Sequence, residues 1–202
     1  MLKGRPLSTG YVTLETIEVD KQSVMDRLDF AKIRLTDLEA LARNGEDLGG
    51  ADPKKRQQFI QEFFFHLLGA TEFLAQVVNT SKSLGIDIEE VTINRVCNTL
   101  KNDPIKTILE ELHPSTRNQS LPPDPYPYSD EGCHFRIVVY RNRVCHHGDN
   151  PFCFRVGSSP STSLFLDPRD TNRRASNESA IRELNHFYDL VNAKCQQVLA
   201  ML

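Results

Sequence analysis

Residues 59–78, with the sequence FIQEFFFHLLGATEFLAQVV, decide the fold of this chain. Their apolar side chains recur at spacings of three and four, as one face of an α-helix requires, and also spread onto the neighbouring faces. A helix that is apolar on more than one side must lie inside the protein, so this segment should form the centre of a helical bundle. Asp52 and Pro53 provide an N-cap and a first-turn residue, and Gly85 ends the pattern, so the helix is predicted over residues 52–84.

Other segments show helical or strand patterns around this centre. A helix beginning with Asp20 as N-cap is predicted up to residue 44, because its apolar residues form one stripe: Val24, Leu28, Ala31, Leu35, Leu38 and Ala42. Further helices are expected over residues 88–101, 104–112 and 129–147, and after a cap at Ser176. Two apolar runs around a turn-rich loop predict a short β-hairpin within residues 152–167.

The predicted fold is therefore all-α, a bundle of four to five main helices with a short β-hairpin insertion. One domain should cover residues 1–202, because a chain of 202 residues with 39% hydrophobic content can build one sizeable core. Residues 1–19 are expected to form an N-terminal extension, and residues 148–175 an insertion before the last helix. The proline-rich segment 121–128 should be a stiff connector.

Composition limits the classes of function. The net charge of −3 argues against a surface coated in positive charge, so any nucleic-acid binding would come from a local patch or a dimer cleft. No apolar run approaches the ~20 residues that cross a bilayer, and the first residues lack a signal-peptide pattern, so we expect a cytoplasmic protein without membrane contact. Five cysteines without a CxxC pair fit reduced thiols.

Polar chemistry is concentrated in residues 140–148, YRNRVCHHG. In a helix, Asn142 and His146 would continue an apolar stripe that contains Phe135 and Val138 or Val139, while Arg136, Tyr140, Arg143 and His147 would form the wetter face. Arg141, Asn142 and His146 would then bring a permanent cation, an amide and a group that titrates near neutrality to one place, which suits a phosphodiester. The other interpretation is structural: the amide and imidazole are satisfied in the core, and Arg141 caps the helix.

The pattern Arg141-Asn142-x-x-x-His146, followed by His147 and Gly148, resembles the Arg-polar-x-x-x-His signature of the HEPN superfamily. This resemblance implies a helical, metal-independent ribonuclease that works as a homodimer, related to toxins or phage defence. The catalytic residues would be Arg141, Asn142 and His146, with His147, Glu72 and Arg143 as auxiliary candidates. Glu72 is a polar residue on the central apolar helix, and its polarity there makes it a possible buried partner for Arg141. His146 would move protons, Arg141 would stabilise phosphoryl charge, and Asn142 would orient His146. RNA would be the substrate and an antitoxin a partner, and no cofactor is expected.

Three alternatives remain open at this point. The chain could be a non-catalytic dimeric scaffold that binds RNA or a nucleotide through Arg141 and Asn142, or the partner protein of a toxin–antitoxin pair. A zinc site could draw on six ligands: Cys133, His134, Cys145, His146, His147 and Cys153. Their spacing lacks the paired pattern of a zinc finger, so we expect no metal, and we interpret Cys133 and Cys145 as small buried hydrophobic residues. His66 should be a structural imidazole with a protein partner.

Overall fold

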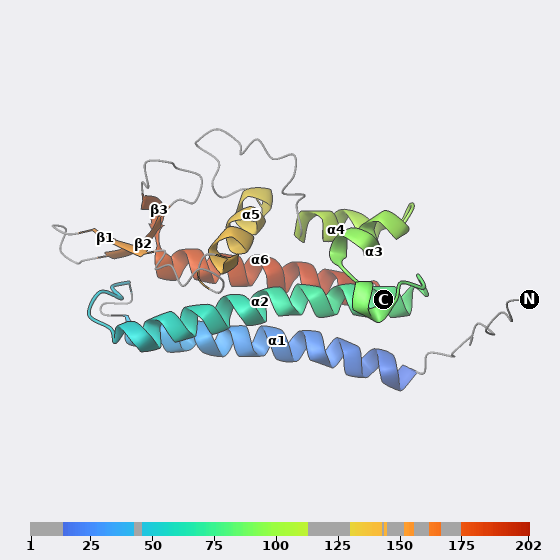
Figure 1. Ribbon diagram of the computed structural model, residues 1–202, viewed down its shortest axis with the longest axis horizontal. Coiled ribbons are helices and arrows are strands. Elements are labelled where there is room, and N and C mark those ends of the chain that lie inside the picture. The colour runs from blue at the N-terminus through green and yellow to red at the C-terminus, as the bar shows by residue number, and fades with distance from the viewer. Residues whose placement is uncertain are drawn as a thin grey trace, which may run out of the picture.

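The computed structural model describes residues 14–42, 46–112, 130–142, 144, 152–155, 162–166 and 175–202 (Figure 1). Within these residues the chain forms six α-helices, a short 3₁₀ helix η1 and three strands. Their bounds are α1 Leu14–Leu41, α2 Pro53–Ser81, η1 Ile88–Glu90, α3 Ile93–Thr99, α4 Pro104–Leu112, α5 Asp130–Arg141, β1 Phe152–Arg155, β2 Thr162–Leu166, β3 Ala175–Ser179 and α6 Ala180–Ala200. The prediction of an all-α bundle with a β-hairpin insertion is confirmed.

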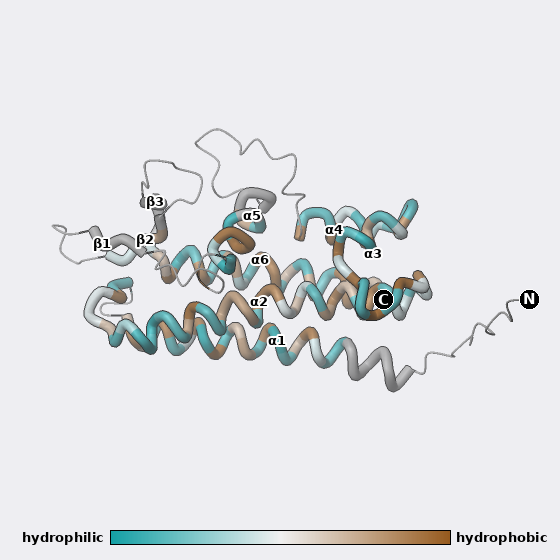
Figure 2. Tube along the Cα trace, in the orientation of Figure 1, coloured by the Kyte–Doolittle hydropathy of each residue, from teal (hydrophilic) through white to brown (hydrophobic). Residues whose placement is uncertain are grey.

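Helix α2 lies at the centre of the bundle. It packs against α1 along its length and also against α6, α5 and α3, and Figure 1 shows α1, α2 and α6 running side by side. Figure 2 shows apolar segments recurring along all three helices, alternating with hydrophilic ones. Residues such as Phe63, Phe64 and Leu67 have no exposed surface. Burying each of these side chains contributes roughly 1.5–3 kcal/mol, so α2 supplies much of the apolar burial that stabilises the bundle.

Local capping explains where α2 begins and ends. The Asp52 carboxylate accepts hydrogen bonds from the backbone N–H of Lys54, at 2.8 Å, and of Lys55, at 3.1 Å. These bonds lower the pKa of Asp52. Pro53 occupies the first turn, where its missing N–H costs nothing. The helix ends at Ser81, three residues before the predicted end, and the chain then turns through Gly85 at a φ of 72°, a conformation that favours glycine.

Helix α1 confirms the predicted stripe but not the predicted start. Val24, Leu28, Ala31, Leu35 and Leu38 are all fully buried. The helix begins at Leu14, so the predicted N-cap at Asp20 is wrong, and residues 14–19 of the expected N-terminal extension belong to the helix. An aspartate caps a helix only where the chain enters it from an extended conformation, and residues 14–19 contain no proline or glycine to stop the helix.

The helix predicted over residues 88–101 is divided in two. Val91 is extended, with φ −66° and ψ 117°, and separates η1 from α3. Thr92 caps α3, its hydroxyl accepting a hydrogen bond from Arg95 N at 3.2 Å. Helix α4 begins and ends as predicted. No described helix is long and apolar enough to span a membrane.

The three strands form an antiparallel sheet in the order β1-β2-β3 at one end of the bundle (Figure 1). Pairing of β1 with β2, in the register Phe152↔Phe165, confirms the predicted hairpin. Strand β3 was not predicted, and it occupies the position where the last helix was expected to begin. Helix α6 instead starts at Ala180, with Ser179 as its N-cap, because Ser179 Oγ accepts a hydrogen bond from Arg182 N at 3.3 Å.

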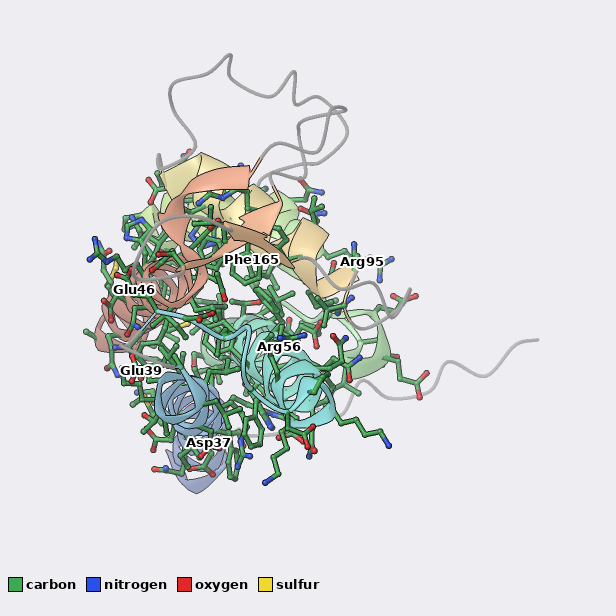
Figure 3. All side chains as sticks on the ribbon, turned by 90° about the vertical axis from the view of Figure 1, so that its left-hand side faces the viewer. Asp37, Glu39, Glu46, Arg56, Arg95 and Phe165 are labelled. Atoms are coloured by element: carbon green, nitrogen blue, oxygen red, sulfur yellow. The ribbon has the colours of Figure 1, made fainter. Side chains whose placement is uncertain are left out.

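The turn between α1 and α2 holds the sheet in place. Ser163 N donates to Glu46 O at 3.2 Å, and Leu48 N donates to the buried Ser163 Oγ at 2.8 Å. Arg56 of α2 donates to Leu48 O at 2.9 Å, and so fixes the same turn. Figure 3 shows Phe165 beneath the strands on the side that faces the helices. The insertion is therefore anchored to the bundle by both polar and apolar contacts.

Candidate functional site

Helix α5 carries the Arg-Asn part of the motif. The helix ends at Arg141, and the backbone widens into a π-type turn that includes Asn142 and Val144. Widened turns of this kind occur frequently at functional sites. Arg143, Cys145, His146 and His147 lie outside the described residues.

The buried face of α5 is not the one predicted from the sequence. Residues on it are Cys133, His134, Arg136, Ile137, Tyr140 and Val144. Arg136 and Tyr140 were expected on the wetter face, but they are only 1% and 0% exposed. Val138, Val139 and Asn142, expected on the buried stripe, are only partly buried. The prediction counted the buried stripe from Phe135 by helical spacing. The fold instead buries Arg136 and Tyr140, which have partners in Glu183 and Phe165.

A buried ion pair fixes the middle of α5 against α6. Arg136 Nη2 lies 2.9 Å from Glu183 Oε1, and the two side chains are 1% and 0% exposed. The Arg136 guanidinium also lies over the Phe187 ring, 5.4 Å from its centroid. Removing either charge would leave the other in an apolar interior, so the pair defines where α5 can sit.

Aromatic packing and one side-chain hydrogen bond fix the second half of α5. Tyr140 stacks on Phe165 of β2, with centroids 4.6 Å apart and an angle of 27° between the rings. Phe64 of α2 lies 6.2 Å from the Tyr140 ring. Gln61 Nε2 donates to Val144 O at 2.9 Å. Because the backbone on both sides of Arg141 is held, through Tyr140 and Val144, the Arg141 side chain lies at a defined place beside α2.

Arg141 is held by two polar neighbours. Its Nη1 donates to Asn142 Oδ1 at 3.1 Å, and its Nη2 lies 3.6 Å from Glu72 Oε1. Glu72 was predicted as a partner for Arg141, and the two side chains are in contact. Glu72 is 67% exposed, however, so it is not the buried carboxylate that the sequence suggested. The amide oxygen of Asn142 contacts Arg141. The expected role of Asn142 in orienting His146 stays a prediction, because His146 lies outside the described residues.

Arg141 lines a pocket of about 120 Å³ between α1, α2 and α5. The residues around it are Arg27, Phe65, Gly69, Glu72, Phe73, Gln76 and Arg141. Two guanidinium groups from different helices thus meet one carboxylate and two aromatic rings. Gly69 lies against the stem of Arg27: a β-carbon at position 69 would lie 3.5 Å from Arg27 Cδ, an ordinary van der Waals distance. The resulting hollow is partly open and carries more positive than negative side chains.

Arg27 was not identified from the sequence, although its placement in the pocket is tightly defined. Its guanidinium carbon lies 5.1 Å from the centroid of the Phe65 ring and 5.2 Å from that of Phe73. Arg27 Nη1 also lies 3.1 Å from His66 Nδ1. The only sequence signal is that position 27 borders the buried stripe through Val24 and Leu28, which is true of many surface residues.

His66 has the structural role expected of it. Burial, assisted by the neighbouring Arg27 charge, lowers the pKa of His66. The neutral ring can therefore accept a hydrogen bond from Arg27 through Nδ1. The Phe30 ring covers His66, with centroids 5.1 Å apart. His66 thus orients the arginine that lines the pocket.

Three cysteines whose side chains the structure describes are buried thiols. Cys97, Cys133 and Cys195 are free, and burial raises the pKa of Cys97 to about 11 and that of Cys195 to about 12. Thiols with such values stay protonated and react poorly near neutral pH. Among the described residues, no three histidine, cysteine or acidic side chains gather as metal ligands would.

The pocket can bind an anion and a flat ring together. Arginine recognises phosphate oxygens through paired N–H donors, and exposed aromatic faces stack on unsaturated rings. Comparisons of the chain with protein-family models, with curated proteins and with solved structures give no match. The relationship to the HEPN superfamily therefore stays a prediction from the motif, and the function is argued from the pocket and the motif together.

Proposed function

We propose that the protein is a metal-independent endoribonuclease of the HEPN type, cytoplasmic and related to toxins or phage defence. The observation that supports this proposal is that Arg141, the first residue of the motif, lines a pocket that also contains Arg27. A permanent cation beside a second arginine is suited to a phosphodiester. Neither arginine requires a metal to attract the phosphate.

In this mechanism the ribose 2′-oxygen attacks the adjacent phosphorus. One imidazole accepts the 2′-hydroxyl proton as the new O–P bond forms, and an acid protonates the 5′-oxygen as its bond to phosphorus breaks. Arg141 stabilises the charge that grows on the phosphoryl oxygens. His146 is the proposed acid or base, with His147 in reserve, and a homodimer would bring a second imidazole to the same phosphate.

A cleavage assay with purified protein tests this proposal. Single-stranded RNA should be cut in the presence of EDTA, leaving 2′,3′-cyclic phosphate ends, whereas DNA should survive because it lacks the nucleophile. His146→Ala should lower the rate by roughly 10²- to 10⁴-fold. Arg141→Ala should also be severe, and Arg141→Lys should restore little activity, because an ammonium lacks the planar paired donors.

The matched control is Arg95→Ala. Arg95 is an exposed arginine, paired with Glu90, that does not line the pocket. Its replacement changes net charge by the same amount as Arg141→Ala and should leave cleavage unchanged. Equal cleavage by the wild-type protein and both motif variants would point to a contaminating nuclease. If light scattering shows only a monomer at micromolar concentration, a catalytic site formed by two subunits would be ruled out.

A non-catalytic function, binding RNA or a nucleotide as a dimeric scaffold, is the second candidate. It is favoured by one specific contact: Asn142 Oδ1 accepts from Arg141 Nη1, so the two residues that the scaffold would use to bind are held together. RNA cleavage distinguishes the ribonuclease from the scaffold. A folded protein that binds RNA without cutting it would support the scaffold.

A further inference from the structure

The pocket contains a feature that the motif does not account for. Phe65 is 57% exposed, although it belongs to the central helix of the bundle. One side of its ring lies near the Arg27 guanidinium. An exposed phenyl ring beside an oriented arginine combines a stacking surface with a cation, which are the two elements used to bind single-stranded nucleic acid.

We propose that the pocket is a subsite for one unpaired nucleotide, in which Phe65 stacks on the base while Arg27 and Arg141 contact phosphates. This inference rests on the proposed function, since it names the form of RNA that the enzyme would take. Arg27 is thereby assigned a binding role that the Arg-Asn-His motif does not include.

Preorganisation of Arg27 supports this role. Two aromatic rings and His66 Nδ1 hold its side chain, so little rotamer freedom remains to be lost when a ligand binds. A guanidinium carries five N–H donors, and His66 takes a bond from Nη1 only. The rest of the fork can therefore approach a phosphate without breaking the contact that orients it.

The size of the pocket favours one unit of a polymer over a whole metabolite. Sites for small molecules usually enclose about 300–1,000 Å³, whereas this hollow holds about 120 Å³ and is partly open. A single base or phosphate can enter while the rest of the chain continues outside. A duplex cannot offer an isolated base, so the unpaired form should be preferred.

The number of phosphate contacts predicts how the affinity for an oligonucleotide depends on salt concentration. For single strands, the logarithm of the affinity falls with the logarithm of the salt concentration with a slope of about −0.7 per phosphate contact. Two arginines at two phosphates predict a slope of about −1.4. A protein of net charge −3 should add little nonspecific attraction to this value.

Binding can be measured apart from cleavage with a fluorescent, single-stranded 2′-O-methyl oligonucleotide, which has no free 2′-hydroxyl to attack. Fluorescence anisotropy across a salt series should give the predicted slope. Arg27→Gln and Arg141→Gln should each reduce its magnitude by about 0.7. Phe65→Ala should weaken binding by roughly 5- to 150-fold, the effect of losing one stacked base, and leave the slope unchanged.

Two matched variants control for the fold. Ile88→Ala removes an apolar side chain that is 71% exposed and does not line the pocket, so affinity should be unchanged. Gly69→Ala adds one methyl group to the pocket at ordinary contact distance from Arg27. Because alanine favours the helix more than glycine does, the Tm should stay equal or rise while affinity falls.

Failure of this inference and failure of the proposed function give different results. Wild-type affinity and salt slope in the Phe65 and Arg27 variants would overturn the subsite, even if RNA is still cut. Equal affinity for a duplex of the same sequence would also overturn it. Loss of affinity in these variants, without any cleavage of natural RNA by the wild-type protein, would support the subsite and reject the ribonuclease.

Discussion

Replacing Glu183 by alanine should strongly lower the free energy of unfolding of the protein and also weaken ligand binding at the pocket. Glu183 and Arg136 are 0% and 1% exposed and lie 2.9 Å apart. The substitution would leave the Arg136 cation in an apolar interior beside Phe187. Removing one partner of a buried pair typically costs about 3–5 kcal/mol, a large part of the roughly 5–15 kcal/mol that stabilises a domain.

The double variant Arg136→Met/Glu183→Leu separates charge from packing. It removes both charges and keeps apolar side chains of similar length, so stability should return to near the wild-type value or exceed it by about 1–4 kcal/mol. Urea denaturation followed by far-UV circular dichroism gives the free energy of unfolding for each variant. Arg182→Ala is the control, because the Arg182–Glu46 pair is exposed on the arginine side and should contribute only about 0.2–1 kcal/mol.

Glu183→Ala should also affect ligand binding, because its partner Arg136 lies on the same helix as Arg141. When α5 is held less firmly against α6, the Arg141 side chain should sample a wider range of positions. Glu183→Ala should therefore bind the 2′-O-methyl oligonucleotide more weakly even at temperatures where it is folded. A loss of stability below about 1 kcal/mol in Glu183→Ala would refute the claim that this pair is a buried charge anchor.

Three further outcomes are expected. Glu72→Gln should raise the oligonucleotide affinity by up to about fivefold in anisotropy titrations, because it frees Arg141 from an exposed ion pair; weaker binding would show that Glu72 helps the ligand. The pKa of His66 is lowered in the folded state, so the free energy of unfolding should fall as the pH drops below the unfolded pKa near 6.5 and level off below the folded pKa. His66→Gln should remove this part of the pH dependence of the urea midpoint, and an unaltered pH dependence would contradict the prediction. Ser163→Ala should cost about 1–3 kcal/mol in urea denaturation, because it leaves the Leu48 N–H without its acceptor, and a change near zero would show that another acceptor replaces it.

The parts of the fold that could be predicted depend on neighbours in the sequence. The stripe of α1 and the multi-sided apolar character of α2 follow from helical spacing alone. Asp52 with Pro53 gave the start of α2, because a cap and a first-turn proline act within one turn. The hairpin of β1 and β2 was predicted for the same reason: its two apolar runs are separated only by a turn-rich loop.

What could not be predicted depends on partners far along the chain. Arg136 looked like a surface residue because nothing near it indicates Glu183 of α6. The placement of β2 depends on the bond between Leu48 and Ser163, which are 115 positions apart. For the candidate site, the contact of Arg141 with Glu72 was predicted, but Arg27 was missed, because it joins the pocket only through the packing of α1 on α2. Arg143, His146 and His147 lie outside the described residues, so their roles stay predictions.

The anchoring of α5 by α6 has a consequence for the order of events on the ribosome. The α1–α2 hairpin can form as soon as its residues emerge, and Arg27, Phe65 and Glu72 are then already in place. Arg141 becomes fixed only when Glu183 has been translated, which at roughly 5–20 residues per second is on the order of ten seconds later. If the protein cuts RNA, the nascent chain is therefore harmless to the message that encodes it until translation has passed α6.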